Sequence, residues 1–464
     1  MKAGSATSFL FGCTLALAAC GSGSGDGGQG AGGTSATGGS HPTGGTSATG
    51  GAPGTGGGSG GTATGGTLGT GGSATGGRSG TGGVPATGGS PGTGGVATGG
   101  SPGSGGGTPT GGRGAAGTSG GGTGPGVGGR AGSPGTGGTA GASGGKQTVC
   151  QFASGLNVAW VNFAGDIPNP NIATFNTIFK NTYNAGGRVI RWWFHTNGTV
   201  TPGYNSDGTV KEIPQSHIDG VKAILNAAHS NGVAIDISLW SFDMLQSNAG
   251  NAHTQNQQLL ENDTIRASYV NNYLTKLVTA LRGTPGLYSY EIFNEPEGMG
   301  PKGWATYRTT EAAIQKCVNW FADAIHAADP DVLVTNGAVT FDYCSNVSGK
   351  TNYYSDDALR NVGGKQNGTL DFYEVHYYTS NGVSNSAFMN PASHWGLDKK
   401  LVMGEFAAAD TDGVAKDSLY THLYDAGYSG AWAWSYDADW PWPAMQAGMQ
   451  NVYNAHTSVV GACP

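Results

Sequence analysis

The sequence predicts a (β/α)8 barrel that follows a long Gly-rich linker. Between residues 147 and 464, short runs of β-branched or aromatic residues alternate eight times with helical patterns, which is typical of this α/β fold. All 11 Trp and all 18 Tyr lie in this part of the chain. Only this part therefore has the apolar content to bury a core, and about 320 residues is an ordinary length for one barrel.

The expected strands and helices follow one another in strict alternation. Strands are expected at residues 156–161, 189–194, 233–240, 287–293, 332–336, 372–376, 401–405 and 430–434. Helices are expected at residues 172–185, 215–230, 264–281, 304–328, 356–362, 392–395, 414–426 and 442–455. Pro214 opens the second helix and Gly232 ends it. A doubly wound sheet is the alternative fold, but no Gly-x-Gly-x-x-Gly turn follows the first strand.

The first 20 residues have the pattern of a secretory signal peptide. Lys2 precedes a short apolar run, and the run ends in Leu17-Ala18-Ala19-Cys20, which resembles a bacterial lipobox. We expect Cys20 to be lipidated and to hold the protein at a bacterial membrane, facing the cell exterior, without a transmembrane helix. An ordinary signal peptide with a coincidental cysteine is the alternative.

Residues 21–146 repeat variants of Thr-Gly-Gly and lack aromatic side chains. Such a segment cannot bury enough surface to offset the entropy of the chain, so we expect a disordered spacer. A Gly/Ser-rich coil of this length spans roughly 60 Å on average. A Gly-rich triple helix and a cell-wall-binding repeat are alternatives, although the repeat lacks a strict three-residue period.

The charge of the chain gives little support to nucleic-acid binding. The formal net charge is -7, charged residues make up 11% of the chain, and no basic block is present. Low charge with abundant Asn, Gly, Thr, Trp and Tyr suits a protein that meets neutral polymers. We expect it to act as a monomer.

Four cysteines lie in the predicted barrel, and an even number in an exported domain suggests disulfides. Of the three possible pairings we favour Cys150–Cys463, which joins the ends of the domain, together with Cys317–Cys344, which closes a short loop. No Cys-x-x-Cys pattern or histidine cluster indicates a metal site, and no cofactor is expected.

Two glutamates occupy equivalent places at the ends of predicted strands. Glu295 ends the fourth strand and Glu405 ends the seventh, so both are expected at the carboxyl-end rim, where barrel enzymes place reactive groups. Glycoside hydrolysis needs such a pair, because one carboxylic acid protonates the leaving oxygen while the other attacks the anomeric carbon or activates water. Each could instead be a solvated loop acid.

Asn294-Glu295-Pro296 and Gly404-Glu405-Phe406 resemble the two catalytic motifs of the retaining barrel superfamily that contains glycoside hydrolase family 5, with its cellulases and β-mannanases. The resemblance covers residues 155–440. It implies that Glu295 is the acid/base, that Asn294 bonds the substrate 2-hydroxyl, and that Glu405 is the nucleophile.

Other positions extend this resemblance. Arg191 matches the second-strand Arg that pairs with the nucleophile and would keep it ionised. His376 and Tyr378 match a sixth-strand His-x-Tyr whose hydroxyl touches the nucleophile, although Tyr377 could take that place instead. Trp434 matches the eighth-strand Trp that forms the floor of the subsite for the sugar whose bond is cut. Packing or structural ion pairs are the alternative roles of these residues.

The end of the third strand bears on the substrate. Many family-5 cellulases carry a His there, whereas this chain has Trp240, which is more similar to β-mannanases and suggests a substrate-binding residue. We therefore expect a retaining endo-β-mannanase, with an endo-β-1,4-glucanase or an exo-acting β-glycosidase as alternatives. A noncatalytic carbohydrate-binding lipoprotein is an alternative of another class.

Two further features remain open from the sequence. Glu291 lies four residues before Glu295 and is expected to be a structural acid inside the barrel. Trp440 and Trp442 follow the last strand, and either sugar stacking or packing at a helix start would explain them equally well.

Overall fold

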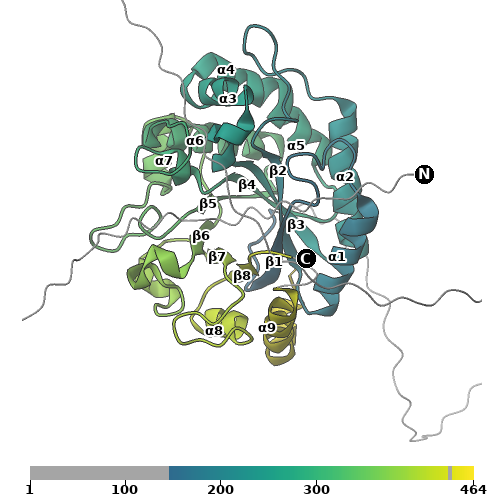
Figure 1. Cartoon of the computed structure of the whole chain (residues 1–464), viewed down its shortest axis with the longest axis vertical. Coiled ribbons are helices and arrows are strands. Elements are labelled where there is room, and N and C mark those ends of the chain that lie inside the picture. The colour runs from purple at the N-terminus through teal and green to yellow at the C-terminus, as the bar shows by residue number, and fades with distance from the viewer. Residues whose placement is uncertain (1–145, 437–440, 464) are drawn as a thin grey trace, which may run out of the picture. The chain divides into compact units, whose positions relative to one another are not determined.

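The computed structural model describes residues 146–436 and 441–463. Within these ranges eight parallel strands close into one barrel in sequence order, which confirms the predicted fold class. Figure 1 shows the strands at the centre and the helices around them. The predicted signal peptide, Cys20 and all but the last residue of the predicted linker lie outside the described residues.

All eight predicted strands are present. They are β1 Ala153–Ala159, β2 Val189–Thr196, β3 Ala234–Ser241, β4 Leu287–Asn294, β5 Leu333–Ala338, β6 Tyr373–Tyr377, β7 Leu401–Phe406 and β8 Gly430–Ala433. Asn157, Arg191 and Asp236 are register partners on β1, β2 and β3. Because register partners point to the same side of a sheet, polar side chains share one layer inside the barrel.

The helices follow the expected alternation with differences at their ends. They are α1 Ile172–Asn184, α2 Gln215–Ser230, α3 Ala252–Glu261, α4 Asp263–Tyr269, α5 Thr275–Leu281, α6 Glu311–Ala328, α7 Asp356–Gly363, α8 Leu419–Asp425, α9 Trp442–Ala455 and α10 Thr457–Val460. A π-helical turn, Val270–Leu274, joins α4 to α5, so the predicted helix over 264–281 is continuous. The segment Ala392–Trp395 is a 3-10 turn.

The helix expected over residues 414–426 is observed only at Leu419–Asp425, and two other helix predictions differ from the structure for physical reasons. The helix expected from residue 304 begins only at Glu311, because the Thr310 side chain accepts a hydrogen bond from the backbone N–H of Ala313 and caps the helix there. The helix α3 was not expected. Its sequence is mostly polar, with Asn256, Leu259 and Leu260 as its buried residues, so no clear apolar period marks it.

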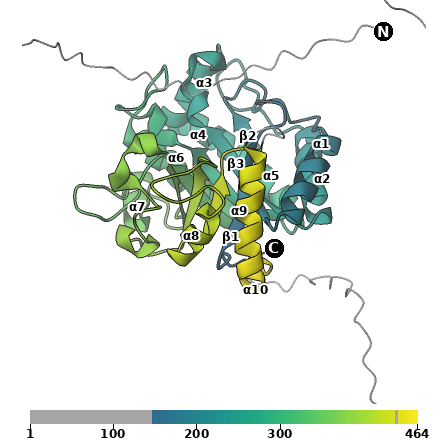
Figure 2. The ribbon, with the colours of Figure 1, turned by 60° about the horizontal axis from the view of Figure 1, so that its bottom comes forward.

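An apolar plug closes the amino end of the barrel. It consists of Ala153, Val189, Ala234, Tyr288, Leu333, Phe372, Val402 and Trp432, together with Cys150 and Cys463. The Trp432 indole donates a hydrogen bond to the carbonyl oxygen of Ala153, at 3.1 Å, so its polar atom is satisfied within the plug. Figure 2 shows α9, in yellow, running alongside β1.

The structure contains one of the two expected disulfides. Cys150 and Cys463 are joined, so the first and last described segments meet at the amino end. The expected Cys317–Cys344 pairing is wrong, since both thiols are free and buried. Cys317 points from α6 toward α4, where its sulfur accepts a hydrogen bond from Arg266 Nε at 3.1 Å, and this contact occupies the thiol.

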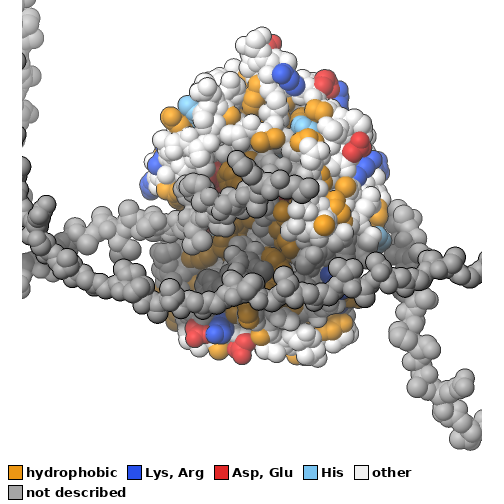
Figure 3. Space-filling model, turned by 45° about the vertical axis from the view of Figure 1, so that its right-hand side comes forward, with side chains coloured by type: hydrophobic (Ala, Val, Ile, Leu, Met, Phe, Trp, Pro, Cys, Tyr) orange, Lys and Arg blue, Asp and Glu red, His pale blue; other side chains and the backbone are white. Residues whose placement is uncertain are grey.

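The exposed surface carries scattered charge. In the part of Figure 3 that is not grey, acidic and basic side chains form small mixed groups among polar and apolar ones, and neither sign covers a wide area, which fits the low charge of the chain. Within the described ranges, no helix combines the length and the apolar character needed to cross a membrane.

Candidate active site

The two glutamates expected from the sequence meet at the carboxyl end of the barrel. Glu295 directly follows β4, and Glu405 lies in β7. One carboxylate oxygen of each, together with a ring nitrogen of His376, lie within 4.8 Å of one another. The fold therefore brings together three side chains that are far apart in the sequence.

Arg191 binds this cluster from below and uses all five of its N–H groups. Nε donates to Glu291 Oε2 at 2.6 Å, and one terminal nitrogen donates to Glu291 Oε1 and Asn294 Oδ1, each at 2.7 Å. The other terminal nitrogen donates to Asn157 Oδ1 at 2.8 Å and to Glu405 Oε1 at 2.6 Å. The guanidinium thus holds Glu405 and Asn294 in one fixed arrangement.

Glu405 also accepts a hydrogen bond from Tyr378. The hydroxyl of Tyr378 lies 2.9 Å from Glu405 Oε2, whereas the Tyr377 hydroxyl donates to Asp412 at 2.6 Å. The structure therefore places Tyr378, and not Tyr377, beside the carboxylate. Burial raises the pKa of Glu405, while Arg191 and the Tyr378 hydroxyl act in the opposite direction and favour its charged form.

Glu295 is held by an unusual backbone conformation. Its φ of 45° and ψ of 51° lie in the left-handed region, which a residue other than Gly adopts at a cost and often at a functional site. Its backbone N–H donates to the carbonyl oxygen of Gly337 at 2.8 Å, and His376 Nδ1 lies 3.0 Å from its Oε1. Burial, and then the nearby Glu405 charge, raise the pKa of Glu295 well above its ordinary value.

The amide of Asn294 is oriented at both of its atoms. Oδ1 accepts from Arg191, and Nδ2 donates to Ser241 Oγ at 3.3 Å. Ser241 in turn donates to Asp243 Oδ2 at 2.7 Å, and burial raises the pKa of Asp243 to about 6. Ser241 ends β3 and Asp243 lies just after it, but their part in this chain of hydrogen bonds was not predicted.

Aromatic side chains gather where β1, β2 and β8 end. Trp434 is half-buried, and its ring centroid lies 5.5 Å from that of Trp193 and 6.1 Å from that of Trp160. Such faces suit the C–H surface of a sugar ring. Trp442 packs on Tyr436 at 5.2 Å at the start of α9, while Trp440 lies outside the described residues.

Trp240 does not line the site, contrary to the expectation. Its side chain is 1% exposed, and its ring packs against His195 at 4.5 Å and Tyr269 at 5.8 Å. The register of β2 and β3 shifts between Trp193 and Thr196, so the strand pattern does not continue unchanged to this point. Trp240 therefore supports the third strand end from within the core.

Several polar residues in the strands were missed by the sequence analysis. Asn157 donates to the carbonyl oxygens of Gly404 and Trp432, at 2.8 and 3.0 Å, and so joins β1 to β7 and β8. Asp236 accepts from Ser289, and Glu374 lies 3.0 Å from Arg191. The sequence does contain a signal for them, namely a polar residue in the middle of an apolar strand. Burying such a residue costs free energy unless a hydrogen-bond partner is present.

Two groups of side chains have the donor types of a metal site. Glu291, Glu374 and His376 form one, and Glu295, His376 and Glu405 form the other, with ligand atoms within 4.8 Å in each. Arg191 already supplies positive charge to Glu291 and Glu405 through hydrogen bonds of 2.6 to 2.7 Å. The donor set is therefore better suited to a guanidinium than to an added cation.

The geometry suits double displacement at a sugar carbon. In retaining glycosidases the two carboxyl groups are about 5–5.5 Å apart, and in inverting ones about 6.5–9.5 Å. One oxygen of Glu295 lies within 4.8 Å of one oxygen of Glu405, and such close carboxylates fit the retaining arrangement. The surroundings also favour different protonation states of the two acids. Arg191 and Tyr378 stabilise the charged form of Glu405, whereas the Glu405 charge opposes ionisation of Glu295.

Comparison with known proteins agrees with this geometry. The family model described as cellulase (glycosyl hydrolase family 5) matches residues 146–439. A mannan endo-1,4-beta-mannosidase from Mytilus edulis is 33% identical over 308 residues, covering 61% of this chain and 83% of that protein. One from Cryptopygus antarcticus is 31% identical over 313 residues, covering 61% of this chain and 80% of that protein.

Solved structures show the same barrel. The beta-mannanase from the blue mussel Mytilus edulis superposes with a TM-score of 0.61 at 31% identity, covering 65% of this chain and 91% of that one. The beta-1,4-mannanase from the sea hare Aplysia kurodai gives a TM-score of 0.62 at 28% identity, covering 69% and 96%. The chain therefore belongs to glycoside hydrolase family 5 and is a glycoside hydrolase.

Proposed function

We propose that the protein is a retaining endo-β-1,4-mannanase in which Glu405 is the nucleophile and Glu295 the acid/base. These roles are assigned from the two carboxylates, which have oxygens within 4.8 Å of each other. Of the two, Glu405 alone accepts hydrogen bonds from Arg191 and Tyr378. The relatives named as mannan endo-1,4-β-mannosidases, at 33% and 31% identity, support the substrate.

In the first step an oxygen of Glu405 attacks the anomeric carbon. The glycosidic C–O bond breaks, and the proton of Glu295 passes to the leaving oxygen. A glycosyl ester on Glu405 and a carboxylate on Glu295 result. The negative charge lost from Glu405 is the charge that Arg191 and Tyr378 stabilise in the free enzyme.

In the second step water attacks the anomeric carbon of the ester. Glu295 takes a proton from this water, the ester bond breaks, and Glu405 regains its carboxylate. Two displacements at one carbon retain its configuration. Asn294, held by Arg191 and Ser241, presents its amide to the 2-hydroxyl, and the Trp434 face supports the ring.

The roles and the substrate are tested together with purified protein. Reducing ends released from mannan, glucomannan, carboxymethyl cellulose, xylan and β-1,3-glucan are measured for the wild type, Glu295→Gln and Glu405→Gln. Glu212→Gln is the matched control, because Glu212 is exposed and pairs with Lys276 away from the site. We expect mannan to be cut internally by the wild type and the control. On mannan we expect a loss on the order of 10⁴-fold or more in the other two variants. Full activity in either variant refutes its role, and cleavage of cellulose without mannan refutes the substrate.

We propose further that the enzyme is a lipid-anchored monomer at the bacterial cell surface. The pattern Leu17-Ala18-Ala19-Cys20 supports acylation of Cys20. The described residues begin at Lys146 and enter β1 at the amino end of the barrel. A tether attached there would leave the carboxyl end of the barrel, where the site lies, free for substrate. Expressed in a bacterium, the wild type should partition with membranes and Cys20→Ser should not, and equal partition contradicts the anchor.

A further inference from the structure

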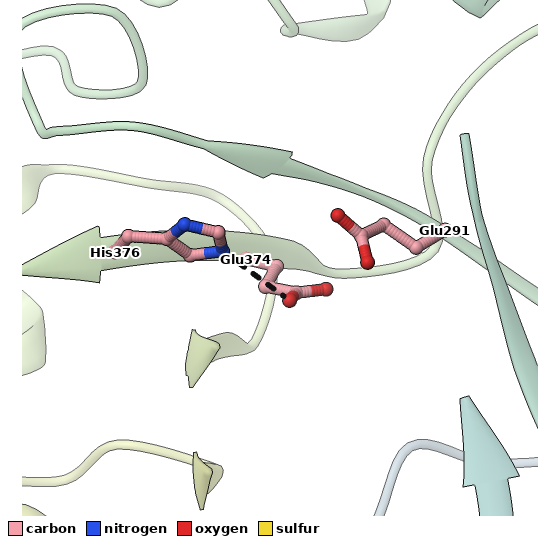
Figure 4. A group of neighbouring side chains, drawn as sticks. All are labelled: Glu291, Glu374 and His376. Carbon is pink, nitrogen blue, oxygen red and sulfur yellow. Dashed lines mark ion pairs between the residues drawn. The ribbon is translucent and has the colours of Figure 1, made fainter. Parts of the chain in front are cut away.

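Directly below the proposed acid/base, two buried polar groups face each other without hydrogen-bond partners. Glu374 and His376 lie two residues apart on β6 and point to the same side of the strand. Both carboxylate oxygens of Glu374 and the Nε2 of His376 have no hydrogen-bond partner among the described residues. Glu374 Oε1 lies 3.7 Å from that nitrogen, and Figure 4 shows the two side chains on one strand, with Glu291 opposite.

Arg191 cannot satisfy Glu374. Its Nε lies 3.0 Å from Glu374 Oε1, but the five N–H groups of Arg191 are directed at Glu291, Asn294, Asn157 and Glu405. A guanidinium has five donors. Glu374 thus feels the charge of Arg191 without receiving a hydrogen bond from it.

Two glycines on the neighbouring strands make room for this pair. A Cβ atom on Gly404 of β7 would lie 2.1 Å from Glu374 Oε1. A Cβ atom on Gly337 of β5 would lie 3.0 Å from His376 Nε2 and 2.2 Å from Glu291 Oε1. Any larger residue would displace the acid or the ring, so the backbone on both sides of β6 is shaped around these side chains.

The charge in this layer exceeds what one arginine can balance. The titratable or charged groups that face Glu374 from the surrounding strands are Arg191, Asp236, Tyr288, Glu291 and Glu405. Arg191 is the only cation in this group, and its hydrogen bonds to carboxylates all go to Glu291 and Glu405. Burial, and then the Glu291 charge, raise the pKa of Glu374 well above its ordinary value, and burial lowers the pKa of His376 well below its own.

We propose that Glu374 is a positioning residue that acts through His376: its carboxylic acid turns across the 3.7 Å that separates it from His376 Nε2 and donates a hydrogen bond to that nitrogen, which keeps the ring proton on Nδ1, facing Glu295. This inference rests on the proposed role of Glu295. A neutral imidazole carries one N–H, so the group at Nε2 decides which nitrogen donates.

The tautomer of His376 determines where the proton of Glu295 lies. With Nδ1 as donor, Glu295 Oε1 accepts at 3.0 Å in both of its charge states, and the proton that moves during catalysis stays on Oε2. With Nδ1 as acceptor, a protonated Glu295 would turn its proton toward His376 and away from the leaving oxygen. Glu374 therefore directs the acid without touching the substrate.

The kinetic test compares Glu374→Gln with Glu374→Met. The Gln amide keeps a donor for Nε2, and we expect kcat within about 3-fold of wild type with an unchanged pH profile. Met has a similar volume and no donor, and we expect kcat to fall about 10-fold or more with little change in KM. The basic limb of the pH profile of Glu374→Met should move to higher pH. The reason is that a protonated Glu295 can then donate to His376 Nδ1, which raises the pKa of Glu295.

Each other kinetic result overturns the proposal. If Glu374 were ionised, both variants would remove a negative charge and move the basic limb to lower pH. If Gln were as poor as Met, or if both matched wild type, no donor at Nε2 would be involved. Circular dichroism and thermal unfolding of each variant establish that it is folded.

A second measurement depends neither on activity nor on the Glu374 variants. Nitrogen-15 NMR of wild-type protein labelled at histidine distinguishes a proton on Nδ1 from one on Nε2, and His376→Gln identifies the signal. We expect a neutral ring with the proton on Nδ1 near pH 6, and a proton on Nε2 overturns the proposal. Activity retained by Glu295→Gln would refute the role of Glu295 but leave this tautomer result unchanged.

Discussion

The two ends of the barrel use its interior in opposite ways. At the amino end, the apolar plug fills the space with side chains such as Phe372 and Trp432, and the Cys150–Cys463 bond closes it. At the carboxyl end, five carboxyl groups surround Arg191. Burying apolar surface stabilises a fold, whereas burying charge costs free energy unless partners are present. Residues that stabilise the fold therefore lie toward one end of the barrel axis, and residues that take part in the chemistry lie toward the other.

The largest effect is expected at Arg191 of β2, and the comparison is with Arg188, the buried arginine directly before β2. Arg191→Met leaves several carboxylates without their cation, and we expect a loss of activity on the order of 10³-fold and about 3–5 kcal/mol of stability. Arg188→Met is the matched variant at the amino end, where Arg188 lies over Tyr183 and Tyr453 at 4.4 and 4.8 Å.

Arg188→Met should lower the unfolding temperature and leave kcat per folded molecule unchanged. The comparison requires kcat and the unfolding temperature of both Arg191→Met and Arg188→Met. A large loss of kcat in Arg188→Met would break the separation between the two ends.

Two tryptophans near the end of β8 sharpen the comparison. Trp432 belongs to the apolar plug, whereas Trp434 follows β8 at the carboxyl end, where its backbone N–H donates to the carbonyl oxygen of Phe406, next to Glu405. Trp432→Ala should cost about 3–5 kcal/mol of stability with kcat intact. Trp434→Ala should lower kcat/KM about 50-fold, roughly 2 kcal/mol, with little change in the unfolding temperature. The reverse pattern in denaturation and kinetic measurements would contradict the assignment.

The disulfide should act on stability alone. Replacing Cys150 and Cys463 by Ser removes a link across 313 residues, and we expect a loss of about 2–5 kcal/mol in the free energy of unfolding. Denaturant titration measures it, with Cys317→Ser as a thiol control that breaks no disulfide. A fall in kcat of the folded double variant would show that the two ends are coupled.

The smallest effect is expected for Tyr378→Phe. The Tyr378 hydroxyl donates to Glu405 and favours its charged form, so its removal should raise the pKa of Glu405 further. Because Glu405 must be ionised to attack, the acid limb of kcat/KM should move to higher pH and the rate should fall about 10-fold. Tyr377→Phe is the control, since Tyr377 donates to Asp412 instead. An acid limb that moves to lower pH would contradict this role of Tyr378.

The sequence predicted the barrel because strand and helix periods differ and alternate clearly, and it predicted Glu295 and Glu405 because they follow apolar strands in matching register. It could not predict Cys317, whose packing against Arg266 depends on tertiary contacts. It misplaced Trp240 because a register shift between β2 and β3 is not visible in the residue pattern. Glu374 was missed because an isolated acid within a strand does not reveal its neighbours.

The central claim is that Glu405 forms a covalent bond with the sugar. The most direct test incubates the enzyme with a 2-deoxy-2-fluoro-β-mannosyl fluoride, which slows the second step, and then locates the label by peptide mass spectrometry. The account predicts one adduct, on the peptide that contains Glu405, formed as activity disappears. An adduct on another residue, or inactivation without any adduct, would contradict it.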